Sequence, residues 1–139
     1  MVTADNRAAR WDLAVSPSAP SIARRHLTTQ LRTWQIAHVD DVETAALITN
    51  ELVTNAVEHS PKGATVIGFA LSFDGAALTI EVRDSSHSPP QLQPLNPLAS
   101  RGRGLQMIDA LTSHWHYELY DTGKTVRAVL PTSTEATPP

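Results

Sequence analysis

Three polar residues at four-residue spacing, Glu51, Asn55 and His59, lie in the most apolar segment of the sequence, residues 40–60. A helix turns by about 100° per residue, so these positions lie along one side of a helix. A carboxylate can act as a general base, and a carboxylate with a carboxamide can hold a hard cation such as Mg²⁺. The same spacing also describes the solvent-facing strip of an amphipathic helix, so the row alone does not identify a site.

Two further segments carry groups that bind ligands. Asp84 ends an alternating segment, residues 76–84, where a carboxylate can accept a hydrogen bond from a ligand amine or simply form a turn. Gly102-Arg103-Gly104 directly precedes an apolar helical pattern that begins at Leu105. Glycines let the backbone approach a ligand closely, and the free N–H groups of a helix start attract phosphate. The alternative for this motif is a flexible loop closure with a helix cap.

Composition restricts the class of protein. The chain has 139 residues, which suits one domain with its own core, and a formal net charge of −3 with no basic run. This charge disfavours direct nucleic-acid binding. There is no cysteine, and no apolar run approaches the roughly 20 residues of a membrane span. The N-terminal residues carry no signal-peptide core, so a cytoplasmic protein without membrane attachment is expected. His114 and His116 would share a strand face, but without a nearby third ligand no zinc site is predicted.

Hydrophobic periodicity predicts the elements that hold these residues. Strands are expected at 11–15, 64–73, 76–84, 115–121 and 124–130, and helices at 21–35, 40–60 and from 105. Consecutive hairpins predict an α+β fold, a two-layer α/β sandwich whose mostly antiparallel mixed sheet has helices on one face. Residues 1–9 are expected to form a flexible N-terminus, 10–131 the domain, and 132–139 a disordered tail. Residues 85–101 hold four of the ten prolines and predict a long functional loop.

In this order, the segments resemble the ATP-binding domain of the GHKL superfamily, of the gyrase, histidine kinase and MutL type, with the Bergerat fold. ELVTNAVEHS resembles the N-box, VRDSSHSPP lies where the G1 box belongs, RGRGLQMIDAL resembles the G2 box, and GKTVRAVLP resembles the closing strand. The resemblance covers roughly residues 10–131. Within the superfamily, the chain is most similar to the RsbW-like anti-sigma-factor serine kinases of bacteria.

The resemblance implies a role for each matched residue, with ATP and Mg²⁺ as cofactors. Glu51 would be the catalytic base and Asn55 the Mg²⁺ ligand, while Asp84 would accept a hydrogen bond from the adenine amino group. Thr125 would support the adenine, and residues 85–101 would form the ATP lid. The phosphates would be wrapped by four consecutive residues, Gly102, Arg103, Gly104 and Leu105. His59 would pack or cap the helix end.

One departure affects the expected activity. The superfamily's G1 box is D-x-G-x-G, whereas this sequence has Ser86 and Ser88 at the two glycine positions. Serine there either weakens ATP binding or requires a different loop path. Two functions are therefore kept. The first is a serine/threonine protein kinase that phosphorylates an anti-anti-sigma (STAS-type) partner and sequesters a sigma factor, as a possible homodimer. The second is a non-catalytic partner-switching module, with or without bound ATP, that acts by stoichiometric binding.

Overall fold

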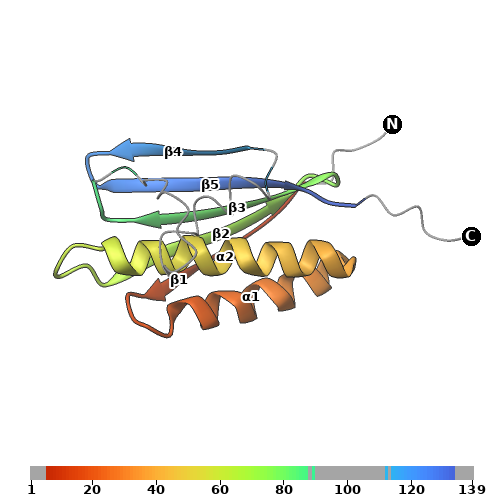
Figure 1. Ribbon diagram of the computed structural model, residues 1–139, viewed down its shortest axis with the longest axis horizontal. Helices are drawn as coiled ribbons and strands as arrows, with labels where there is room; N and C mark the ends of the chain where they lie inside the picture. Colours follow the sequence, from red (N-terminus) through yellow and green to blue (C-terminus); the bar gives the residue numbers. More distant parts are fainter. Residues whose placement is uncertain (1–5, 88, 90–111, 113, 134–139) are drawn as a thin grey trace, which may run out of the picture.

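A computed structural model describes residues 6–87, 89, 112 and 114–133. The elements are, in chain order, β1 (Arg7–Ala14), α1 (Ala19–Thr33), α2 (Val39–His59), β2 (Val66–Phe73), β3 (Ala77–Asp84), β4 (His114–Tyr120) and β5 (Gly123–Pro131). The strands form one sheet in the order β1-β2-β3-β5-β4, and every pairing between them is antiparallel. Both helices lie on the same face of this sheet (Figure 1). The predicted two-layer α+β architecture is confirmed.

The alternation of side chains along each strand separates two faces of the sheet. On the inner face, toward the helices, the side chains are apolar and buried, as shown by Ile67 and Phe69 of β2 and by Ile80 and Val82 of β3. Burying this surface against the helices is the main favourable contribution to folding, at about 25 cal/mol per Å² of apolar area. The core therefore lies between the inner face and the two helices.

The outer face of the sheet carries charged side chains. Arg10, Glu81 and Arg127 lie in one transverse row, because Arg10 pairs with Ala70, Ala70 with Glu81, and Glu81 with Arg127. The Arg127 Nε donates to Glu81 Oε1 at 2.8 Å, and an Arg10 nitrogen lies 3.8 Å from Glu81 Oε2. The hydrogen bond to Glu81 is the largest of the effects that raise the pKa of Arg127 above its ordinary value.

The helices form where the sequence places apolar residues at helical spacing. Ala19, Ala23, Leu27 and Leu31 recur every four residues and are buried along one side of α1. Proline is in the first turn of this helix, where its missing N–H costs no hydrogen bond. In the described part of the chain, neither helix is long and apolar enough to cross a membrane.

Most predicted boundaries differ from the observed ones by one or two residues. The largest difference is at the N-terminus, where β1 begins at Arg7, so residues 7–9 are strand and not part of a flexible segment. α1 begins at Ala19 and not at Ser21, whose hydroxyl instead donates to the Ser18 carbonyl. Most of the expected loop 85–101, the expected helix from residue 105 and the tail from residue 134 lie outside the described residues.

The turn between β4 and β5 requires glycine at position 123. Gly123 has a φ of +149°, and a Cβ on it would lie 2.0 Å from the carbonyl oxygen of Asp84. The start of β5 and the end of β3 therefore approach more closely than any side-chain-bearing residue allows. This contact fixes the relative position of the two strand ends.

Gly123→Ala should lower the free energy of unfolding by about 3 kcal/mol or more, since strain and overlap add. Gly63→Ala is the matched control, because Gly63 also has a positive φ, +93°, but nothing lies within 4 Å of its added Cβ. The control should lose only about 1 kcal/mol from strain alone. Denaturant unfolding measures both values, and equal losses would contradict the close contact.

Candidate functional site

The end of β3 carries a buried ion pair. Asp84 is directly opposite Lys124 in the β3–β5 register, and the Lys124 Nζ lies 3.1 Å from Asp84 Oδ2 and 3.3 Å from Oδ1. Side-chain exposure is 1% for Lys124 and 2% for Asp84. Lysine and aspartate are rarely buried to this degree unless they are paired. The pair therefore forms a polar centre at the edge of an apolar core.

The backbone after Asp84 orients its carboxylate. The N–H of Ser86 donates to Asp84 Oδ1 at 2.8 Å, which is the turn that aspartate commonly forms two residues ahead. Ser86 is 6% exposed. Among the described residues, the only non-glycine residue with positive φ is Gln35, so Ser86 occupies its position without left-handed backbone strain. The serine at this glycine position thus has an unstrained path through the start of the loop.

Thr125 lies on the other side of the sheet from Asp84. It pairs with Arg83, and residues directly opposite each other share a face, so its side chain is on the outer face. Its hydroxyl is buried without a hydrogen-bond partner in the described part of the chain. Lys124 holds the inner position beside Asp84, whereas Thr125, which the resemblance associated with the adenine, lies on the outer face. The sequence analysis did not single out Lys124. Because neighbouring residues of a strand point to opposite faces, the position next to Thr125 was the signal that could have identified it.

Glu51 and Asn55 lie on the side of α2 that is turned away from α1. Asn50 marks the α1 side, since its side-chain oxygen accepts a hydrogen bond from Arg24 of α1. At about 100° per residue, Glu51 lies about 100° and Asn55 about 140° around the helix from Asn50. Both are half-buried, and neither has a hydrogen bond or ion pair within the described residues. Within the described part of the chain, no other side chain competes for these two groups.

Asp84 is level with the last turns of α2. The N-terminal part of α2 is tied to the end of β5, where the Ser133 N–H donates to Asp41 at 2.7 Å, and Thr132 N–H bonds to the Ala76 carbonyl. From there α2 runs along the sheet in the direction of β3 (Figure 1). The eight residues of β3 span roughly 26 Å, which a helix covers in about 17 residues. Counting from Asp41, this reaches the turns that contain Asn55 and His59.

The other predicted site residues divide into two groups. Gly102, Arg103, Gly104 and Leu105 lie outside the described residues. His59 is exposed in the last turn of α2 and is the basic residue near that helix end. Its position suits a favourable interaction with the helix dipole and not a role in the buried centre. Among the described residues, no three histidine, cysteine, aspartate or glutamate side chains form a metal-binding group.

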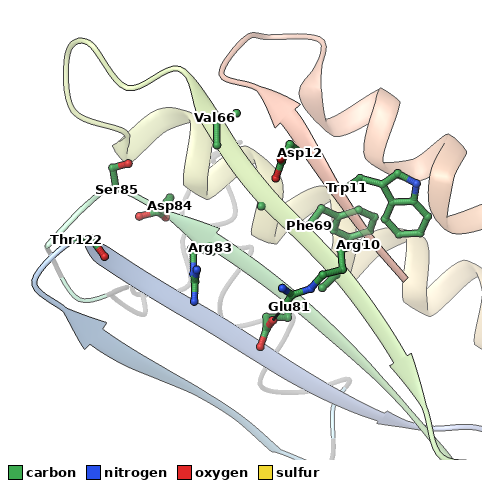
Figure 2. Close-up of a pocket in the computed structure, with 12 residues that line it drawn as sticks. Arg10, Trp11, Asp12, Val66, Phe69, Glu81, Arg83, Asp84, Ser85 and Thr122 are labelled. Carbon is green, nitrogen blue, oxygen red and sulfur yellow. Dashed lines mark ion pairs between the residues drawn. The ribbon is translucent and has the colours of Figure 1, made fainter. Parts of the chain in front are cut away.

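A pocket of about 310 Å³ opens mainly on the outer face, over the small residues Gly68 and Ala70 of β2. Figure 2 shows its rim, where Arg10 and Arg83 alternate with Asp12 and Glu81. A polyphosphate would meet two carboxylates there, so the pocket does not suit a nucleotide. Asp84 and Ser85 also line this pocket at the end of β3, although strand alternation directs the Asp84 and Lys124 side chains toward the inner face. The candidate site is therefore on the inner face, between α2 and β5.

The sequence profile of the histidine kinase-like ATPase domain matches residues 14–130. This is most of the chain, which therefore belongs to the histidine kinase-like ATPase domain family. The expected membership of the GHKL superfamily is confirmed. No curated protein sequence matches the chain.

Solved structures share the fold. The RsbU and RsbW domains of Rv1364c from Mycobacterium tuberculosis align with a TM-score of 0.66 and 24% identity, over 94% of this chain and 34% of that one. The histidine kinase domain of the Erythrobacter litoralis EL346 blue-light activated histidine kinase aligns with a TM-score of 0.51 and 14% identity, over 88% of this chain and 63% of that one. The mycobacterial sensor histidine kinase MprB aligns with a TM-score of 0.51 and 13% identity, over 88% of this chain and 98% of that one. The chain thus spans about a third of the Rv1364c structure.

Lys124→Met should lower the free energy of unfolding by about 3 kcal/mol or more, because it leaves the Asp84 carboxylate buried without its counter-ion. The double variant Asp84→Asn/Lys124→Met should recover much of this loss, since no buried charge remains. Denaturant unfolding of the two single variants and the double variant measures the coupling. Additive losses would show that the two side chains do not depend on each other.

Proposed function

We propose that the chain binds ATP with Mg²⁺ and acts as a serine/threonine protein kinase of the anti-sigma type. The observation that supports the proposal is that Asp84, a buried carboxylate, lies near the last turns of α2, where Glu51 and Asn55 have no hydrogen-bond partner among the described residues. One group recognises a base amine, one supplies an oxygen ligand to a metal ion, and one accepts a proton. Family membership and the likeness to a structure that includes an RsbW domain support the same reading.

The described residues fit both cofactors. The Asp84 carboxylate keeps a free lone pair for the exocyclic amine of adenine, because an ionised carboxylate accepts about four hydrogen bonds. Asn55 offers a single oxygen, which suits Mg²⁺, an ion that keeps several waters and binds substrate phosphates. ATP supplies the phosphoryl group when bound. The motif Gly102–Leu105 is proposed to wrap its phosphates.

Glu51 is the proposed general base. It lies one turn before Asn55 on the same side of α2, so a proton acceptor would stand beside the proposed metal ligand. Phosphoryl transfer depends mostly on positioning and on charge neutralisation, and the base needs only to accept the proton of an attacking serine hydroxyl. The proposed substrate is a STAS-type anti-anti-sigma protein, with a sigma factor as the sequestered partner and a homodimer as the acting form.

A second candidate is a binding module without phosphotransfer. Lys124 favours it, because the ammonium supplies the Asp84 carboxylate with a partner when no base is bound. The serine-substituted G1 segment favours it as well. In this reading the same fold holds its partners by stoichiometric contact.

Isothermal titration of the full chain should show ATP binding that strengthens when Mg²⁺ is added, because Asn55 would hold the ion and the ion would neutralise phosphate charge. Asn55→Ala should lose most of this Mg²⁺ dependence while keeping the binding seen without metal. No detectable binding at millimolar ATP would refute both the kinase and the ATP-bound module. It would leave only a nucleotide-free module.

Glu51→Ala should reduce phosphate transfer from labelled ATP to candidate anti-anti-sigma proteins by about 100-fold or more, with ATP affinity nearly unchanged. Glu43→Ala is the matched control, since Glu43 is an exposed carboxylate two turns earlier on α2. The control should transfer phosphate like the wild type. Transfer that survives Glu51→Ala would show that another group is the base.

A further inference from the structure

Among the described residues, the ammonium group of Lys124 has fewer hydrogen-bond partners than it can use. It is buried, with 1% side-chain exposure, and within the described residues its only polar partner is the Asp84 carboxylate. An ammonium has three N–H donors in a tetrahedral arrangement. Those that point away from the carboxylate need an acceptor, because leaving a buried donor unpaired is costly. The position thus presents a donor directly beside the proposed base acceptor.

The carboxylate of Asp84 can take a ligand without releasing Lys124. Its Oδ1 accepts from the Ser86 N–H and from Lys124, whereas Oδ2 lies 3.1 Å from the Lys124 Nζ and accepts no hydrogen bond from a described residue. A lone pair on Oδ2 remains. Displacing Lys124 instead would leave an ammonium buried without its counter-ion, which is strongly unfavourable. The ion pair is therefore compatible with a bound base and would remain intact.

We propose that Lys124 is a second base-contacting residue, which donates a hydrogen bond to N1 of adenine while Asp84 accepts one from the 6-amino group. This inference rests on the proposed nucleotide binding and adds a specificity residue to it. The two head groups are in contact at 3.1 Å, so they match two base atoms that are attached to one carbon, as N1 and the 6-amino nitrogen are. Guanine presents the opposite polarity, with an acceptor at position 6 and a donor at N1, and would meet Asp84 with its carbonyl oxygen.

The geometry of the strand ends holds Lys124 and Asp84 in a fixed relative position, which suits recognition of one base. Lys124 follows Gly123, whose backbone packs against the Asp84 carbonyl, so the two residues cannot shift independently. Lys124 is also directly opposite Asp84 in the sheet register. A preorganised donor and acceptor lose little entropy on binding, which favours discrimination between bases.

The test combines changes to the ligand and to the protein. Wild-type protein is titrated with ATP, with 1-deaza-ATP, which lacks N1, and with 7-deaza-ATP, which lacks N7. We expect 1-deaza-ATP to bind about tenfold or more weakly than ATP, since it loses a charge-assisted hydrogen bond, and 7-deaza-ATP to bind like ATP. In Lys124→Met the affinities for ATP and 1-deaza-ATP should become equal.

A second measurement does not depend on the variant being stable. ATP labelled with ¹⁵N at N1 and N7 is bound to the wild-type protein, and the resonance of N1 should shift as expected for an accepted hydrogen bond. The resonance of N7 should stay near its free position. This spectrum reports on the contact even if Lys124→Met does not fold.

The outcomes separate this inference from the proposed function. Wild-type protein that binds ATP but shows no penalty with 1-deaza-ATP overturns the role of Lys124 and leaves ATP binding intact. An equal 1-deaza penalty in Lys124→Met and wild type also overturns it, as does a penalty or resonance shift at N7 in place of N1. Wild-type protein that binds no nucleotide overturns both proposals.

Discussion

The ion pair of Asp84 and Lys124 is the interaction on which the candidate site depends. Two charges taken out of water cost several kcal/mol each, and their mutual attraction compensates only when the geometry is good. Here that geometry comes from the sheet, because the two residues are direct partners in the β3–β5 register. Antiparallel pairing, the close backbone contact of Gly123 and the Ser86 N–H all act on the same few atoms. The polar centre is therefore a product of backbone pairing as much as of side-chain chemistry.

The two faces of the sheet divide the tasks of the protein. The inner face packs its apolar residues against the helices and carries the Asp84–Lys124 pair at its end. The outer face holds a row of charges, Arg10, Glu81 and Arg127, that satisfy one another. Because Arg83 and Asp84 are neighbours on one strand, two very different environments lie a single residue apart. The alternation of a strand is what permits this separation.

Much of this structure could be predicted from the sequence. The helical period of residues 40–60 predicted α2, and turn residues such as Asp74 and Gly75 located the hairpin of β2 and β3. The Asp74 side chain accepts two backbone N–H groups in that turn, which is the local chemistry that makes such signals readable. Local propensity therefore gave both the elements and their order.

The face on which a residue of β5 lies was harder to predict. It depends on register, and a shift of one residue exchanges the two faces of a strand. The family resemblance assigned Thr125 to the adenine without a face, and the β3–β5 pairing puts Lys124, and not Thr125, on the inner face with Asp84. The start of β1 at Arg7 was missed for a related reason, since its alternation with small residues becomes informative only when it pairs with β2. Both features depend on long-range pairing, which no short window of sequence contains.

The two charged residues of the polar centre are separated by forty positions in the chain. Most of that separation is the connection from β3 to β4, and the free energy of closing a loop grows only with the logarithm of its length. Doubling such a connection would cost about 0.6 kcal/mol. The register of β3 with β5 holds Asp84 opposite Lys124, whatever the length of chain between them. The connection between β3 and β4 could therefore be lengthened at little cost while the β3–β5 register keeps the pair in place.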